Sequence, residues 1–215
     1  MLGEFLNLYL PALKAHLIRE KGLTTHAADD ALQGFVLDKI IRAKLLGHAD
    51  HERGRFRTFL LSVLENYLSN LQRSERAKGR SPDKPLQPLD GQKISSTEGD
   101  SVLGTFEVEW ARQLVTQALM MMEQECVDLG RHDIWAVFEA RVVRPTLGED
   151  RPIPYSEVAA DIGFVSPSQA YNTLVTGKRM FARALRSAIA QYAADDAAIE
   201  EELADLKRII FGGGA

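Results

Sequence analysis

The chain has 215 residues and a formal net charge of −4, and 45% of its residues are hydrophobic. This length permits one domain of ordinary size or two small ones, and no apolar run approaches the roughly 20 residues that a membrane-spanning helix needs. One cysteine, Cys126, excludes an internal disulfide and suits a reducing compartment. With Glu4 in place of a basic segment, the N-terminus lacks the features of a secretory signal peptide, so we expect a cytoplasmic protein with no membrane partner.

Helices are predicted for most of the first third of the chain. Apolar residues recur at helical spacing over 5–19, where Pro11 predicts a kink or break near Leu10. Thr24 or Thr25 can cap the next helix. Its apolar stripe is Ala28, Leu32, Phe35, Val36 and Ile40, with Ile41 as a further candidate. A third helix is predicted from about Phe56 to Ala77, and its inward residues include Phe56, Phe59, Leu60, Leu64, Tyr67 and Leu68.

No helical periodicity is present between residues 78 and 105. The segment "GRSPDKPLQPLDGQKISSTEGDS" is rich in proline, glycine and serine, a composition typical of flexible linkers. The sequence therefore predicts an all-α fold with two small helical domains, at 1–77 and 106–194, joined by a flexible linker at 78–105. An acidic helix and tail follow at 195–215.

The second half of the chain contains a helix-turn-helix pattern. In "PYSEVAADIGFVSPSQAYN", Gly163 is placed to end a short helix in the left-handed conformation. Ser166 can then serve as an N-cap, Pro167 suits the first helical position, and Gln169 can complete a capping box. Before this pattern, helices are predicted around Trp110 and over "HDIWAVFEARVVRP", which should stop at Pro145.

The second helix of this pattern carries hydrogen-bonding side chains early and cations later. Ala170, Leu174, Met180, Phe181 and Leu185 face inward by spacing. The outward-facing residues are Ser168, Gln169, Tyr171, Asn172, Thr176, Lys178, Arg179 and Arg183. That order suits a helix end inserted into the major groove of DNA, and the alternative is a helical hairpin whose arginines are merely solvated.

Positive charge is concentrated in two zones of this acidic chain. One lies between Arg53 and Lys84, and the other lies between Tyr171 and Tyr192, where no acidic residue occurs. Two separate basic zones suggest two contacts with one polyanion.

Taken in order, these segments resemble the bacterial sigma-70 family. The resemblance is carried by "HAADDALQGFVLDKI", by "HADHERGRFRTFLLSVLENYLSNLQRSERAKGR", by the linker and by the helix-turn-helix, and it extends from about Leu6 to Leu206 apart from the linker. It is closest to the two-domain extracytoplasmic-function sigma factors. It implies a non-enzymatic subunit of RNA polymerase, whose first domain opens the −10 promoter element and whose second domain reads the −35 element. Many members have a further helix before the one near Glu4, so a truncated or misassigned start is one expectation.

The resemblance also implies partners and residues. Core polymerase would be bound through its β′ coiled coil and β flap, and the β′ contact would use Asp29, Asp30, Gln33 and Asp38. Many members carry an acidic residue where Gly34 stands. An anti-sigma factor and a Ser/Thr kinase are candidate regulators, with Thr24 and Thr25 as the phosphorylation candidates, since a phosphate is favourable at a helix N-terminus.

Contacts to the −10 strand need cations for phosphates and planar groups for bases. The residues expected there are Arg53, Arg55, Arg57, Asn66, Asn70, Arg73 and Arg76. His48 and His51 lack further ligands at matching spacing, so neither a metal nor another cofactor is expected. The acidic C-terminal helix is expected to pack on the second domain, to mask its basic face, or to be solvated.

Two other function classes remain open from the sequence. A helix-turn-helix repressor or activator could dimerise through its N-terminal helices and act without being a polymerase subunit. A helical enzyme or scaffold that binds no nucleic acid is supported only by the net acidity.

Overall fold

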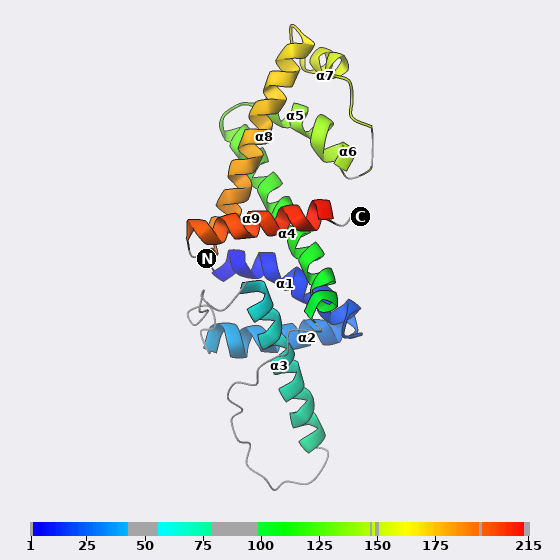
Figure 1. Ribbon diagram of the computed structural model, residues 1–215, viewed down its shortest axis with the longest axis vertical. Coiled ribbons are helices and arrows are strands. Elements are labelled where there is room, and N and C mark those ends of the chain that lie inside the picture. Colours follow the sequence, from blue (N-terminus) through cyan, green and yellow to red (C-terminus); the bar gives the residue numbers. More distant parts are fainter. Residues whose placement is uncertain are drawn as a thin grey trace. The chain divides into compact units, whose positions relative to one another are not determined.

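The computed structural model is all-helical in the residues that it describes (Figure 1). These residues are 2–42, 56–78, 99–146, 148, 151–193 and 195–212, and side chains are not described for 2–5, 56, 75–78 and 99–103. The contacts divide the chain into an N-terminal unit, Leu6–Trp110, and a C-terminal unit, Ala111–Ala215 with Met1–Phe5. Within the described part of the chain, no helix combines the length and the hydropathy that a membrane crossing requires.

The N-terminal unit is built from α1 (Leu2–Arg19), α2 (Thr25–Phe35), the π-helical turn η1 (Val36–Arg42), α3 (Phe56–Lys78) and the beginning of α4 (Gly99–Asp128). Its core is aliphatic and aromatic, with Leu13, Leu17, Phe35, Leu60 and Leu64 fully or almost fully buried. Thr24 caps α2, because its hydroxyl accepts a hydrogen bond from the Ala27 N–H at 3.3 Å.

Of the predicted kink or break at Pro11, the break does not occur, because α1 continues through this residue. Proline removes one backbone hydrogen bond from a helix interior, which favours a kink or a break. Here the residues on both sides of it, including Leu8, Tyr9, Ala12 and Leu13, are buried, and this packing holds the helix continuous.

The helix α4 begins earlier than the sequence indicated. Residues 99–105, predicted to belong to the linker, are helical, and the chain is assigned to the N-terminal unit as far as Trp110. Phe106 and Trp110 are fully buried, and the Phe106 ring stacks on Tyr9 with a centroid distance of 6.4 Å. Burial of these two rings explains why the helix starts before the residue at which periodicity becomes visible. At the other end of the predicted linker, Lys78 still belongs to α3, and residues 79–98 lie outside the described residues.

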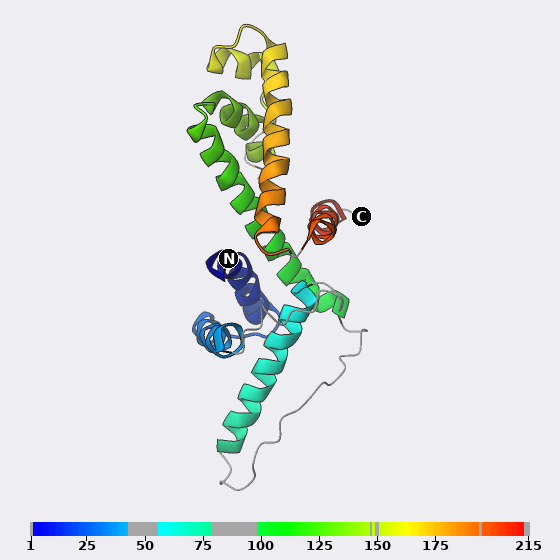
Figure 2. The ribbon, with the colours of Figure 1, turned by 90° about the vertical axis from the view of Figure 1, so that its left-hand side faces the viewer.

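The C-terminal unit contains the end of α4, α5 (His132–Phe138), the π-helical turn η4 (Glu139–Val143), α6 (Arg144–Thr146), α7 (Tyr155–Ile162), α8 (Pro167–Ala190) and α9 (Asp196–Gly212). Pro145 does not stop the helical run, which reaches Thr146. In Figures 1 and 2, α5 and α7 both lie beside α8, as their contacts require. The three helices share one core, with Ile134, Phe138, Val158, Ala170 and Leu174 buried in it.

The crossing of α5 and α8 depends on Gly177. A Cβ atom at this position would lie 3.2 Å from Phe138 Cδ2 and 3.4 Å from Ile134 Cγ2. A glycine in the middle of a helix costs about 1 kcal/mol relative to alanine. The close approach of α5 and α8 explains why glycine occupies this position despite that cost.

Candidate nucleic-acid interface

The turn between α7 and α8 has the hydrogen bonds expected from its sequence. Gly163 has φ of 80°, the Phe164 N–H donates to the Ala159 carbonyl at 2.7 Å, and the Gly163 N–H donates to the Ala160 carbonyl at 3.2 Å. This pair of bonds is a Schellman motif, which ends α7 and redirects the chain. The turn therefore fixes the direction in which α8 leaves α7.

The start of α8 is capped from both sides. The Ser166 hydroxyl accepts from the Gln169 N–H at 3.3 Å, and Pro167 occupies the first turn as predicted. The hydrogen bond of the Gln169 side chain differs from that of the predicted capping box, in which the donor would be the Ser166 N–H. The Gln169 Oε1 atom accepts from the N–H of Val165 at 3.1 Å, one residue before the cap. Both ends of the turn thus have satisfied backbone donors, as a well-defined helix start requires.

All eight residues predicted to face outward on α8 are exposed. Successive residues of a helix are rotated by about 100°, which places Ser168, Asn172, Arg179 and Arg183 within about 60° of one another. Gln169 and Thr176 border this stripe on one side, and Tyr171 and Lys178 border it on the other. The result is a continuous polar face with hydrogen-bonding groups near the N-terminus and cations further along.

Two side chains on this face have neighbours within the unit. The Tyr171 ring is 54% exposed and packs edge-on against Tyr155 at 5.7 Å, and the Arg141 guanidinium lies over Tyr155 at 4.2 Å. Arg183 forms an ion pair with Glu125 of α4 at 2.7 Å. Among the described residues, Lys178 and Arg179 form no ion pair, so their charges are available to an anion.

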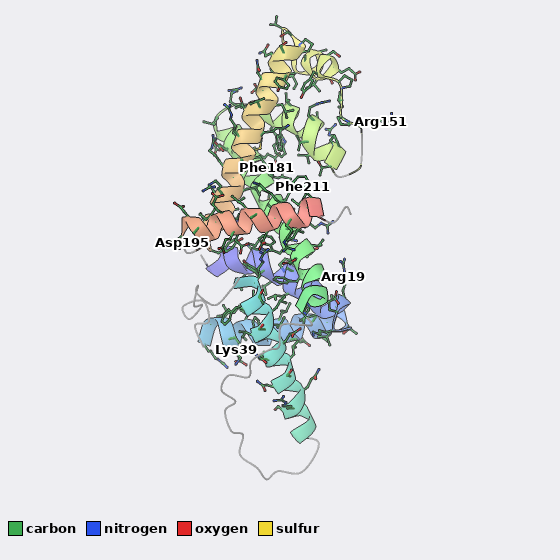
Figure 3. The ribbon with its side chains drawn as sticks, viewed as in Figure 1. Arg19, Lys39, Arg151, Phe181, Asp195 and Phe211 are labelled. Carbon is green, nitrogen blue, oxygen red and sulfur yellow. The ribbon has the colours of Figure 1, made fainter. Side chains whose placement is uncertain are left out.

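The C-terminal helix α9 packs on α8. Glu200 of α9 pairs with Arg186 of α8, and the Tyr192 hydroxyl donates to Glu202 at 3.4 Å. The Asp195 side chain accepts from the Ala198 N–H at 2.8 Å and so caps the helix. Figure 3 shows Asp195 at the start of α9, Phe211 near its end and Phe181 on α8. Of the alternatives from sequence, the acidic helix packs on α8, and its Glu200 also pairs with Arg186 of the basic zone.

The helix α3 presents part of its predicted strand-binding set. Asn66, Asn70 and Arg73 are exposed and recur at i, i+4 and i+7, which places them on one face. Arg53 and Arg55 lie outside the described residues, as do His48 and His51, and the same is true of the Arg76 side chain.

Arg57 does not lie with those residues. Its side chain is 1% exposed, and its guanidinium carbon lies 3.7 Å from the centre of the Trp110 ring. The spacing to Leu60, Leu61 and Leu64 places it on the buried stripe of α3, on the opposite side of the helix from Asn66. The expectation of an accessible strand contact at Arg57 therefore needs correction, since in this structure it is a core residue stacked on an aromatic ring.

The residues predicted to bind polymerase are exposed on α2 and η1. Asp29 pairs with Lys14 at 2.6 Å, Asp30 with His26 at 3.0 Å and Asp38 with Arg42 at 2.7 Å, and Gln33 is also exposed. Thr25 is exposed in the first turn of α2. Surface pairs of this kind contribute little to stability, so the carboxylates can exchange partners.

An apolar groove beside these carboxylates was not recognised from the sequence. It has a volume of about 530 Å³ and is lined by Leu10, Pro11, Lys14, Asp29, Leu32, Gln33, Val36 and Leu37. Leu37 and Ile41 are 46% and 49% exposed. Ile41 was a further candidate for the buried stripe, and its exposure shows that it does not belong to that stripe.

Gly34 is enclosed by Tyr67 of α3. A Cβ atom at Gly34 would lie 2.3 Å from the Tyr67 hydroxyl oxygen, and the Tyr67 ring packs edge-on against Phe35 at 5.7 Å. Burial, and then the negative charge of Asp38, raise the pKa of Tyr67. Any larger side chain at position 34, an acidic one included, would require Tyr67 to move.

No group of three or more His, Cys, Asp or Glu side chains in the described ranges is arranged to hold a metal ion. Cys126 is buried, and this burial raises the pKa of its thiol, which disfavours the reactive thiolate. No family model, curated protein or solved structure matches the chain.

Proposed function

We propose that this chain is a sigma factor of the extracytoplasmic-function type, which joins core RNA polymerase and directs it to promoters. The observation that carries the proposal is the helix-turn-helix of α7 and α8, with a Schellman turn, a capped second helix and eight exposed polar or cationic side chains on it. Hydrogen-bonding groups near the start of α8 suit base edges, and the cations beyond them suit phosphates. In this proposal α8 reads the −35 element as duplex.

The N-terminal unit would supply the polymerase contact. The groove between α1 and α2 offers apolar surface that Asp29 and Gln33 line with polar groups, and Asp30 and Asp38 are exposed on α2 and η1. A desolvated apolar centre with a polar rim is the usual composition of a protein interface. Asn66, Asn70 and Arg73 on α3 would contact the melted −10 strand, together with the predicted arginines that lie outside the described residues. The proposal includes the two-domain partition with its linker, a cytoplasmic location and a non-enzymatic role, and an anti-sigma factor or a kinase as regulator.

Co-purification with core RNA polymerase and transcription from a bound promoter test the proposal. We expect the purified chain to form a stable complex with core enzyme and to support promoter-dependent initiation. Leu37→Arg should abolish the complex because it places a charge in the groove. Lys178→Ala combined with Arg179→Ala should leave the complex intact and abolish −35-dependent initiation. Arg151→Ala, an exposed residue before α7, is the matched control and should change neither property.

Failure to join core polymerase, with and without a Ser/Thr kinase present, would exclude the sigma-factor function. A stable dimer that binds a palindromic duplex without polymerase would instead support the helix-turn-helix repressor or activator. Sedimentation of the free chain and binding to duplexes without core enzyme distinguish these two results.

A further inference from the structure

Arg186 extends the exposed polar face of α8 but was not among its predicted contacts. It follows Arg179 by seven residues and Arg183 by three, spacings that keep all three side chains on one side of a helix. By the same rotation, Arg186 points in the same direction as Ser168 in the first turn. The arginine side chain is 46% exposed, so it lies at the surface of the unit.

The charge of Arg186 is already engaged within the chain. Its guanidinium Nη1 donates to the Glu200 carboxylate of α9, which is itself exposed. The backbone of α9 is held against α8, with Ile199 and Leu206 of α9 buried. The Arg186 guanidinium therefore already has a carboxylate partner in the free chain.

We propose that Arg186 is a phosphate-contacting residue of the α8 face and that α9 is an intramolecular competitor, whose Glu200 withholds this arginine until DNA displaces it. The proposal rests on the proposed function only in requiring duplex binding by α8. Cations near the C-terminal end of a recognition helix commonly contact the phosphate backbone, which positions the protein without reading sequence. Competition by Glu200 would weaken binding to all duplexes equally.

The test measures binding of the full chain to a fluorescent mixed-sequence DNA duplex over a range of salt concentrations. Glu200→Gln removes the competing charge, and we expect a roughly twofold to fivefold gain in affinity, the range that an exposed ion pair is worth. Glu201→Gln is the matched control, since it makes the same charge change at the neighbouring exposed position on α9. It should produce a smaller gain that reflects net charge alone.

Arg186→Ala decides whether the gain comes from the proposed contact. In the Glu200→Gln background, it should lower the affinity below the level of Glu201→Gln, which keeps the contact, and reduce the slope of log K against log salt by about 0.9, the value of one lost phosphate contact. Equal gains from Glu200→Gln and Glu201→Gln would overturn the competition. An unchanged salt slope after Arg186→Ala would overturn the phosphate contact.

The same experiments separate this inference from the sigma-factor function. A chain that binds duplex with the expected pattern but never joins core polymerase would retain the competition by α9 and lose the sigma-factor function. If instead the chain joins polymerase and Glu200→Gln has no specific effect on duplex binding, the sigma-factor function is retained and the competition by α9 is lost. Circular dichroism melting of each variant checks that α9 remains helical, as expected for exchanges at exposed positions.

Discussion

The helices α3 and α8 are both predicted to contact DNA through cations, but they differ in whether those cations are exposed or buried. On α8, every predicted contact is exposed, and the buried residues form a separate stripe. On α3, Asn66, Asn70 and Arg73 are exposed, whereas Arg57 is buried against Trp110. The difference shows that charge alone does not identify a surface residue. The position of Arg57 three residues before Leu60 places it on the apolar stripe, and this spacing was visible in the sequence.

The largest expected effect comes from removing Arg57. Arg57→Ala should destabilise the N-terminal unit by about 2–5 kcal/mol, because it leaves a cavity beneath Trp110 and removes the stacking contact. Arg73→Ala, on the exposed face of α3, is the control and should change stability by less than about 0.5 kcal/mol. Urea denaturation measures both. If Arg57→Ala left stability unchanged but weakened binding to single-stranded DNA, Arg57 would be a DNA contact like the exposed residues of α8, and not a core residue.

Variants at Gly34 and Tyr67 test how closely α3 packs against α2. Alanine at position 34 should not gain its usual advantage of about 1 kcal/mol over glycine in a helix, since its Cβ would collide with the Tyr67 hydroxyl. In a Tyr67→Phe background the collision is removed, and Gly34→Ala should stabilise the protein by about 0.8–1 kcal/mol. Denaturation of the four variants in this cycle gives the coupling. Equal effects of Gly34→Ala in both backgrounds would contradict the close approach.

A third test uses pH. His16 of α1 is fully buried, with its Nε2 atom 3.5 Å from Glu65 of α3, and burial and then the charge of Lys21 lower its pKa below 6.5. The unfolded chain therefore binds a proton more readily than the folded one, so stability should be fully present above about pH 6.5 and should fall as the pH decreases from there. Chemical denaturation between pH 8 and pH 5 measures this loss.

His16→Leu should remove this acid dependence. His26→Gln is the control, because His26 is exposed and its pKa is raised, first by a backbone hydrogen bond and then by Asp30. Its contribution has the opposite sign, being present below pH 6.5 and lost as the pH rises. An acid loss that persisted in His16→Leu would assign the dependence to other groups.

The smallest expected effect concerns Arg183 on α8. Arg183→Ala should reduce the slope of log K against log salt for duplex binding by about 1, the value of one phosphate contact. Glu125→Gln, which removes the partner of Arg183 in the free chain, should leave that slope unchanged and strengthen binding slightly. An unchanged slope in Arg183→Ala would show that Arg183 does not contact DNA. The binding face would then be limited to the earlier part of α8.

Much of the C-terminal unit could be predicted because its signals are local. Gly163, Ser166 and Pro167 act through bonds and angles within a few residues, and each has the role that its sequence context indicated. The continuous course of α1 through Pro11 could not be predicted in this way, because it depends on packing. The early start of α4 depends likewise on the burial of Phe106 and Trp110 against residues far away in sequence. The apolar groove was missed because both α1 and α2 contribute to it.

The π-helical turn η1 has a further consequence for how this surface tolerates length changes. Phe35 and Ile40, which are five positions apart, are both buried, and this spacing matches the i→i+5 hydrogen bond of a π-helix and not the i→i+4 bond of an α-helix. Loss of one residue between Val36 and Arg42 would allow a regular α-helix with little rotation of Arg42 relative to Phe35, because six α-helical residues turn by about as much as seven π-helical ones. We therefore expect relatives of this chain that lack one residue here to present nearly the same side chains from a regular α-helix.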